Sequence, residues 1–340
     1  MSLWQRVRTL DGQTVLFAGA LLVFGLVMLL SATSAVSAQH DGSPYYFVAR
    51  QLVSGVFPGM ILFFFFGLTD YRRWRDWAVA ALVLSLGALV LVFIPGIGQV
   101  RGGSHSWIGF GSATFQPSEI VKLTFLIYVS AWLAARKGGD AHDIEKGLLP
   151  FLGAVGAVML LLILQPDTGS MAVIVGTALA LYFVSGAPIS WFLALCAAGA
   201  GIVGLLVRIS PYRAARFMTF LHPELDPMGK GYHINQALLA IGSGGFWGVG
   251  YGQSRQKFLY LPEVQSDSIS AVMGEELGFI GIVIFLGVYS LLVWRAIQIA
   301  REARDPFGMY IAAGIAAMLV IQLFLNIGSM TGLVPITGVT

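Results

Sequence analysis

The run Val15-Leu-Phe-Ala-Gly-Ala-Leu-Leu-Val-Phe-Gly-Leu-Val-Met-Leu-Leu30 contains no charged or strongly polar side chain. With its flanks it forms an apolar stretch over residues 14–37, long enough to cross the roughly 30 Å hydrocarbon core of a bilayer as a helix. No small-residue cleavage site follows a short apolar core, so we expect an uncleaved anchor and not a signal peptide. The fold is therefore predicted to begin with a transmembrane helix.

The same pattern recurs along all 340 residues, of which 57% are hydrophobic and 11% charged, against roughly 25% charged in an ordinary soluble domain. Further apolar runs lie at about 48–69, 77–95, 117–135, 147–164, 171–186, 188–207, 270–294 and 308–328. A tenth run begins where the sequence stops at Thr340. We predict an all-α polytopic membrane protein, a single integral membrane domain over residues 1–340 with nine complete spans and the start of a tenth.

Basic residues in the short loops set the orientation of such a protein. If the N-terminus is cytoplasmic, the short outer loops hold little beyond Arg101, whereas the inner side holds a long series of basic residues. These are Arg6, Arg8, Arg72, Arg73, Arg75, Arg136, Lys137, Lys146, Arg295, Arg301 and Arg304. The segment 208–270 is then extracytoplasmic, between the seventh and eighth spans. Because basic residues are shared between the two sides of the membrane, the sequence does not support nucleic-acid binding.

The outer segment 208–270 is polar, rich in glycine and charged, unlike the rest of the chain. Ser210-Pro211 predicts a helix start, with the serine at the N-cap and proline at the first helical position, and residues 212–221 and 232–245 are expected to be helical. The glycines at 242–252 either make a tight packing turn or let backbone N–H groups approach an anion.

Asp267 closes this segment, at the outer end of the eighth span. It has two readings: an N-cap of the following helix, as Ser266 and Ser268 could also be, or a carboxylate that accepts a proton in a reaction. Arg213, Arg216 and Lys257 share the segment and are a plausible clamp for a phosphorylated headgroup.

Other polar residues sit at or within the spans, where ionisable groups are costly. Glu119 and Lys122 are three residues apart and can neutralise each other on one helical face, which indicates either a polar cavity or a structural pair. Asp167 can cap the sixth helix. At least one of Glu275 and Glu276 must face the interior, because two adjacent carboxylates cannot both face lipid.

Several chemistries find no support in the sequence. The five histidines lack metal-ligand spacing, so no metal-ligating residues are predicted, although a divalent cation stays open as a cofactor. No Gly-x-Ser-x-Gly elbow is present, and the single cysteine, Cys196, cannot form an internal disulfide.

The chain resembles the SEDS family (shape, elongation, division and sporulation) of peptidoglycan glycosyltransferases, and its division branch more than its elongation branch. The matching motifs, in order along nearly the whole chain, are Ser106-Trp107-Ile108, Gln116-Pro-Ser-Glu119 with Lys122, Gln165-Pro-Asp-Thr-Gly169, Tyr212-Arg213, Arg216-Phe217, Gly231-Tyr-His-Ile-Asn-Gln236, Ala240-Ile-Gly-Ser-Gly-Gly245, Lys257, Leu261-Pro-Glu263, Asp267, Gly274-Glu-Glu-Leu-Gly278, Asn326-Ile-Gly328 and Gly332-Leu-Val-Pro-Ile-Thr-Gly338. The resemblance implies a ten-helix fold, so the chain is expected to be truncated at its C-terminus and inactive or weakly active.

This resemblance implies polymerisation of lipid II at the outer face of the bacterial cytoplasmic membrane, in cell division, with Asp267 as the catalytic carboxylate. The expected substrate-binding residues are Arg213, Arg216, Lys257, Glu119, Lys122 and Gln236. The expected partners are a class B penicillin-binding protein, other divisome proteins and membrane lipid. Two alternatives are left open: a lipid II flippase that uses the cavity at Glu119 and Lys122, and a scaffold that recruits a transpeptidase.

Overall fold

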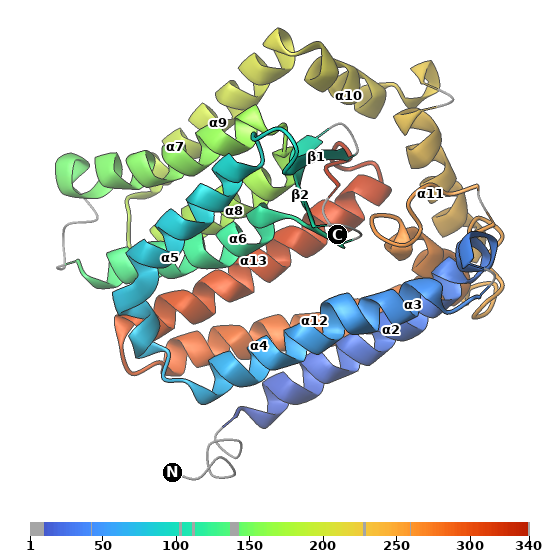
Figure 1. The fold of residues 1–340 in the computed structure, drawn as a ribbon, viewed down its shortest axis with the longest axis horizontal. Helices are drawn as coiled ribbons and strands as arrows, with labels where there is room; N and C mark the ends of the chain where they lie inside the picture. The colour runs from blue at the N-terminus through green and yellow to red at the C-terminus, as the bar shows by residue number, and fades with distance from the viewer. Residues whose placement is uncertain are drawn as a thin grey trace. The chain divides into compact units, whose positions relative to one another are not determined.

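The computed structural model describes residues 10–41, 43–101, 104–110, 113–136, 143–226, 229–258 and 260–338, and Figure 1 shows its ribbon. The chain folds into two compact units. Unit 1 comprises Met1–Thr69, Val203–Arg295 and Leu323–Thr340, and unit 2 comprises Asp70–Ile202 and Ala296–Gln322. The single integral membrane domain predicted over residues 1–340 stays a prediction.

Eight helical segments among the described residues are long and apolar enough to cross a membrane: Gly12–Ala38, Tyr46–Leu68, Arg72–Leu91, Pro117–Ala134, Ile144–Leu164, Ile189–Ile209, Ile269–Glu302 and Pro306–Met330. Each overlaps a run predicted from the sequence. The remaining predicted span, 171–186, coincides with α8 (Thr168–Val184), an apolar helix of 17 residues. Residues 331–338, where a tenth span was predicted to begin, form a turn followed by irregular backbone. The chain is thus a multi-pass helical membrane protein.

Unit 2 is a helical bundle around an aromatic and aliphatic core. It contains α5 (Arg72–Leu91), α6 (Pro117–Ala134), the short π-helix η3 (Ile144–Leu148), α7 (Leu149–Leu164), α8, and most of α9 (Ile189–Ile209) and α13 (Pro306–Met330). Phe125, Phe151 and Tyr182 are buried in the core, and the rings of Phe151 and Tyr182 stack with centroids 4.4 Å apart.

A three-stranded antiparallel sheet, which the all-α prediction did not include, joins α5 to α6. Its strands are β1 (Gly98–Arg101), β2 (Ser104–Phe110) and β3 (Ala113–Phe115), in the order β1-β2-β3. Ser106 and Ile108 on β2 are buried, whereas His105 is exposed and Trp107 is half-buried. This alternation has the period of two that a strand requires, but it is too short to stand out between long apolar runs.

In unit 1, α2 (Gly12–Asp41) runs antiparallel to α12 (Ile269–Glu302). Three contacts along the pair establish the direction: Asp11 bonds Arg295 at 2.6 Å, the rings of Phe24 and Phe285 stack 5.7 Å apart, and Ser31 Oγ donates to Glu276 at 2.7 Å. The same unit contains α3 (Tyr46–Gln51), the π-helix η1 (Leu52–Val56) and α4 (Phe57–Leu68).

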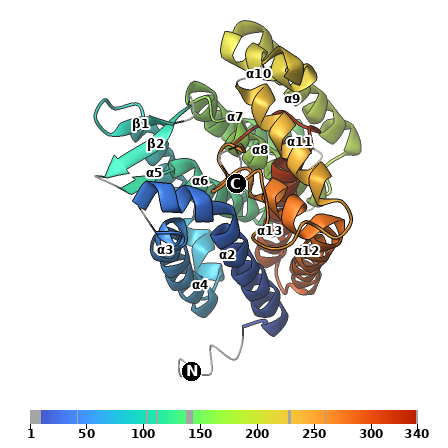
Figure 2. The ribbon, with the colours of Figure 1, turned by 90° about the vertical axis from the view of Figure 1, so that its right-hand side faces the viewer.

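The outer segment of unit 1 contains α10 (Pro211–Leu221), the 3-10 turn η4 (Pro223–Leu225) and α11 (Lys230–Gly244), which Figure 2 shows in yellow and orange. Both helices predicted in this segment are confirmed. Ser210 occupies the N-cap of α10 with proline next to it, but its side chain makes no capping hydrogen bond. Pro211 has no N–H and a pre-set φ, so it starts the helix without that bond.

Helix α12 is broken at Gly278, whose φ is 66°. The glycine-rich segment (residues 245–252) pairs with the break: Val249 N–H and Gly250 N–H donate to the carbonyls of Glu275 and Glu276, both at 3.0 Å. In return, Phe279 N–H donates to Gly245 O at 3.0 Å. Backbone groups released by a break within a span must find such partners. The glycines therefore make a packing turn, one of the two readings that the sequence allowed.

Candidate active site

Asp267 lies at the end of a tight turn that leads into α12. In this turn, defined here as the Asp267 turn (residues 262–268), the N–H groups of Ser266 and Ser268 donate to Glu263 O at 3.0 and 3.3 Å. Glu263 has a φ of 51°, in the left-handed region that non-glycine residues avoid. The Asp267 carbonyl accepts from Asn326 Nδ2 at 3.4 Å. The turn thus places a half-buried carboxyl group at the N-terminal end of a membrane helix.

The pKa of Asp267 is raised from its ordinary 3.8 to about 6, mainly because the carboxyl group is buried. The neighbouring Glu263 carboxylate contributes to this rise, and the Arg216 guanidinium opposes it by favouring the charged form. Catalytic bases work best when their pKa lies near the operating pH. The carboxyl group is therefore mostly ionised at neutral pH while still holding a proton more tightly than an exposed aspartate would.

Among the described residues, no hydrogen bond supports the interpretation of Asp267 as an N-cap. Within the described part of the chain, the Asp267 carboxylate accepts no hydrogen bond from the first turn of α12, and the carbonyl of Ser268 accepts from Ala271 and Val272 N–H. An N-cap side chain would accept from one of those early N–H groups. Asp267 is thus not held by the helix end that it precedes.

Of the predicted substrate-binding residues in unit 1, Arg216 lies near enough to Asp267 for its charge to lower the pKa of the carboxyl group. Arg213 is on the same helix, α10, three residues earlier, and both arginines are half-buried. Gln236 is half-buried on α11. The structure therefore places Arg216 near Asp267, and it places Arg213 on the same helix as Arg216.

Lys257 is engaged by protein groups instead of facing solvent. Its side chain is 2% exposed, and its ammonium donates to Glu276 Oε1 at 3.0 Å, to Ser31 Oγ at 3.1 Å and to Gly252 O at 2.8 Å. An ammonium has three protons, and all three are used here. Binding of Lys257 to a substrate would require this network to open.

Glu275 and Glu276 are both buried, which confirms that these adjacent carboxylates do not face lipid. Glu275 accepts from Ser254 Oγ at 2.6 Å and from the N–H groups of Arg255 and Gln256 at 2.8 and 3.4 Å. Glu276 accepts from Ser254 N–H at 3.3 Å as well as from Lys257, so both glutamates bind segment 252–257 and meet at Ser254. Together they attach the chain that precedes the Asp267 turn to α12.

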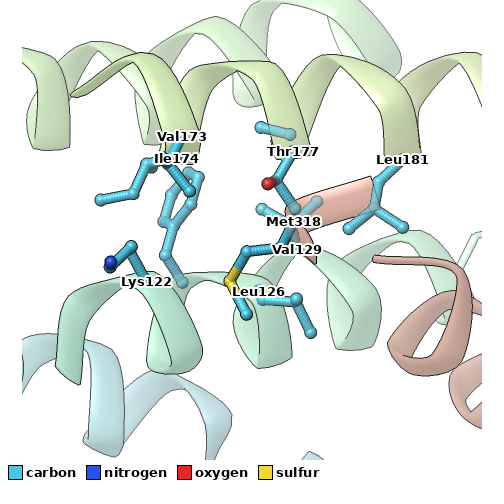
Figure 3. A pocket seen from close by; sticks show the side chains of 10 residues that line it. Lys122, Leu126, Val129, Val173, Ile174, Thr177, Leu181 and Met318 are labelled. Carbon is cyan, nitrogen blue, oxygen red and sulfur yellow. The ribbon is translucent and has the colours of Figure 1, made fainter. Parts of the chain in front are cut away.

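Glu119 and Lys122 pair in unit 2, as predicted, with Oε2 and Nζ 2.7 Å apart. The Lys122 side chain is 7% exposed and that of Glu119 is 53% exposed, so the pair spans a boundary between interior and surface. Beside Lys122 lies a pocket between α6 and α8 (Figure 3). Its other lining residues are mainly apolar, unlike the polar cavity that the sequence suggested.

Asp167 caps α8, as predicted, and also joins that helix to α6. Its Oδ1 accepts from Ser170 N–H at 3.0 Å, and its Oδ2 accepts from Gln116 Nε2 and Ser118 Oγ, both at 2.9 Å. The carboxylate is buried and fully engaged at the starts of two helices. This arrangement fixes the register of α6, which carries Glu119 and Lys122.

Three residues near Asp267 were not singled out by the residue chemistry alone. His233 bonds Ser268, the residue after Asp267, and Asn326 bonds the Asp267 carbonyl. Gly338 is close as well, because a Cβ added there would lie 3.7 Å from Asp267 Oδ2. His233, Asn326 and Gly338 do fall within motifs that carry the family resemblance. Among the described residues, no group of three or more His, Cys, Asp and Glu side chains is arranged to hold a metal ion.

The family model for FtsW, RodA and SpoVE, described as "Cell cycle protein", matches residues 13–340. Stage V sporulation protein E of Bacillus subtilis (strain 168) is 44% identical over 322 residues, which are 94% of this chain and 87% of that protein. A protein named probable peptidoglycan glycosyltransferase FtsW from Trichlorobacter lovleyi is 38% identical over 340 residues, 98% of this chain and 87% of its own.

A solved structure is also similar, from work described as "Structural coordination of polymerization and crosslinking by a peptidoglycan synthase complex". The TM-score is 0.79 at 29% identity, and the match covers 97% of this chain and 90% of the solved one. The similarity therefore extends over the whole membrane fold and includes the segment that carries Asp267.

Proposed function

Because the chain belongs to the FtsW, RodA and SpoVE family of cell cycle proteins, we propose that it is a peptidoglycan glycosyltransferase that polymerises lipid II, with Asp267 as the general base. The carrying observation is the half-buried carboxyl group of Asp267, whose pKa is raised to about 6 beside Arg216. The names of its relatives support the reaction. The environment of Asp267 supports the assignment of its base.

In the proposed reaction, the 4-hydroxyl of the acceptor GlcNAc attacks C1 of the donor MurNAc. Asp267 takes the hydroxyl proton while the new O4–C1 bond forms, and the bond from C1 to the lipid diphosphate breaks with its electron pair on the diphosphate. A single displacement turns the α-linked donor into a β-linked product. General base catalysis of this kind contributes typically about 10² to 10⁴ in rate.

The leaving diphosphate is already anionic, so it needs positive charge and not a second acid. Arg216 and Arg213 on α10 are the proposed cations, with Gln236 on α11 as a further polar contact. Lys257, Glu119 and Lys122 remain proposed substrate contacts, although Lys257 is held by Glu276 and Lys122 by Glu119.

The distribution of basic residues supports a cytoplasmic N-terminus and an Asp267 turn on the outer face of the cytoplasmic membrane. Similarity to a chain from a peptidoglycan synthase complex supports a class B penicillin-binding protein as the cross-linking partner. Similarity to proteins named FtsW supports action at the division septum with other divisome proteins, whereas similarity to a sporulation protein makes spore formation the setting to compare.

The decisive experiment is polymerisation of purified lipid II by the chain and its Asp267→Asn variant, alone and with the partner, with glycan strands resolved on a gel. Asparagine keeps the shape but cannot take the proton, so product formation should fall by roughly 10² or more. Glu224→Gln is the matched control, because it removes one exposed carboxylate of the same outer segment. Wild-type polymerisation by Asp267→Asn would reject the base assignment, whereas absence of polymerisation by the unsubstituted chain and its partner would favour the flippase or scaffold alternative.

A further inference from the structure

His233 on α11 reaches across to the chain immediately after Asp267. Its imidazole is buried, with the residue 7% exposed, and Nε2 lies 2.6 Å from the hydroxyl oxygen of Ser268. Ser268 is itself fully buried. The proposed mechanism gives neither residue a task, yet Ser268 directly follows the proposed base and His233 bonds Ser268.

The direction of this hydrogen bond follows from the other bond that Ser268 makes. The Ser268 hydroxyl donates to Pro262 O at 2.7 Å, and a hydroxyl has a single proton to donate. Towards His233 the Ser268 oxygen must therefore accept, so Nε2 of His233 carries a proton. The hydrogen bonds therefore run in one direction, from His233 to Ser268 and from Ser268 to Pro262. Because Pro262 and Ser268 are the first and last residues of the Asp267 turn, the second bond joins its two ends.

The Asp267 turn contains features that oppose its geometry. The backbone of Glu263 has a left-handed φ of 51°, which residues other than glycine rarely adopt. The carboxylate of Glu263 also acts on Asp267 as a like charge. A strained turn with two like charges keeps one conformation only when its surroundings impose it. The hydrogen bonds through Ser268 are such a constraint.

The imidazole is presented by a helix that is itself packed against α12. Ala237 and Ala240, four and seven residues after His233, share its helical face and are fully buried against a cluster that includes Ala271 and Val272. His233 is thus supported by backbone and methyl packing, with little freedom to follow a turn that shifts.

We infer that His233 is a positioning residue for Asp267: through Ser268 it fixes the Asp267 turn, and with it the place of the carboxylate relative to the acceptor hydroxyl. This inference rests on the proposed function and deepens it. His233 itself touches neither substrate nor reacting atoms in this role. Misplacement of a catalytic group by about 1 Å can cost on the order of 10² in rate.

The test uses the full chain and lipid II polymerisation, with kcat and KM determined separately for His233→Leu and His233→Gln. Leucine fills similar space without a donor, whereas the amide nitrogen of glutamine can take the place of Nε2 and donate to Ser268. We expect His233→Leu to lower kcat by about tenfold or more, with little change in KM, and His233→Gln to recover most of it. His222→Leu, at an exposed histidine of the same outer segment, is the control and should retain wild-type kcat.

Ser268→Ala supplies a second route that does not touch the imidazole, and it should lower kcat to a similar extent. The double variant with His233→Leu should be no worse than the more damaged single one, because both remove the same chain of bonds. Wild-type kcat in a folded His233→Leu protein, or failure of glutamine to rescue, overturns the inference. If His233→Leu does not fold, Ser268→Ala and His233→Gln decide it. Full activity of Asp267→Asn in the same assay would instead overturn the assignment of Asp267 as the base.

Discussion

Lys257 and Glu276 form a buried ion pair, with Nζ and Oε1 3.0 Å apart, between the outer segment and the broken part of α12. The two side chains are 2% and 0% exposed. Ser31 of α2 bonds both partners, since its Oγ donates to Glu276 and lies 3.1 Å from the ammonium. With Ser31, the pair therefore joins α2, α12 and the segment that contains Lys257. Lys257 lies ten residues before the proposed base.

Lys257→Met should destabilise unit 1 strongly, because it leaves the Glu276 carboxylate buried without its cation. Loss of one partner of a buried pair typically costs about 3–5 kcal/mol. Lys257→Met combined with Glu276→Gln should recover part of the loss, since neither charge is then left alone. A thermal-shift cycle of the four proteins in detergent measures this coupling. Strictly additive changes would show that the two side chains do not interact in the folded protein.

Polymerisation should depend on pH through the ionisation of Asp267. With a pKa raised to about 6, kcat/KM should rise as pH passes through about 6 and then level off, because only the ionised carboxylate accepts a proton. Glu263→Gln removes a like charge and should move the midpoint lower, whereas Arg216→Gln removes an opposite charge and should move it higher.

Folding stability should follow the opposite course from activity. The folded state binds the Asp267 proton more tightly than the unfolded state does, so the contribution of Asp267 to stability falls as pH rises from about 4 to about 6. Gln265→Ala changes no charge in the Asp267 turn and serves as the control for both profiles. Identical midpoints in all four proteins would mean that another group governs the acidic limb.

The pair at Glu119 and Lys122 should respond unequally to substitution. Glu119→Gln leaves the buried Lys122 ammonium without its partner, whereas Lys122→Met leaves only the largely exposed Glu119 carboxylate, which water can solvate. Glu119→Gln should therefore lower the melting temperature more than Lys122→Met does. Thermal unfolding of the two single variants and the double variant tests this order. Equal losses would indicate that Lys122 is solvated in the folded state.

Gly278→Ala should disrupt the junction between α12 and the glycine-rich segment. Its φ is 66°, and a Cβ there would lie 2.2 Å from Gly248 N. Strain of this kind costs about 1–3 kcal/mol before the clash is included. Gly287→Ala is the matched control on the same helix, where a Cβ meets nothing within 4 Å. Comparable melting temperatures for the two variants would contradict the geometry.

The sequence predicted the helices well because their signal is long and unambiguous. Every predicted span overlaps a helix, and the pairing of Glu119 with Lys122 and the cap at Asp167 followed from spacing alone. The sheet was missed because Ser106 and Ile108 give only a short alternation. A sequence pattern predicts structure well when it lies within a single helix or at its end.

Contacts between distant segments could not be read in this way. Lys257 was grouped with Arg213 and Arg216 as a clamp because all are cations in one outer segment, but its partner Glu276 and the hydroxyl of Ser31 lie in other elements. The link from His233 to Ser268 joins α11 to the Asp267 turn. Such contacts depend on packing, which composition and spacing do not encode.

The break at Gly278 divides α12 into two lengths with separate tasks. From Phe279 to Glu302 the helix is about 36 Å long at 1.5 Å per residue, enough to cross a hydrocarbon layer of about 30 Å without help. The part before the break is not needed for crossing, so its buried glutamates are available to bind segment 252–257. Membrane anchoring and the support of Asp267 thus become separable properties of one stretch of chain. A change in bilayer thickness should be absorbed by the length after the break, while the carboxylate keeps its surroundings.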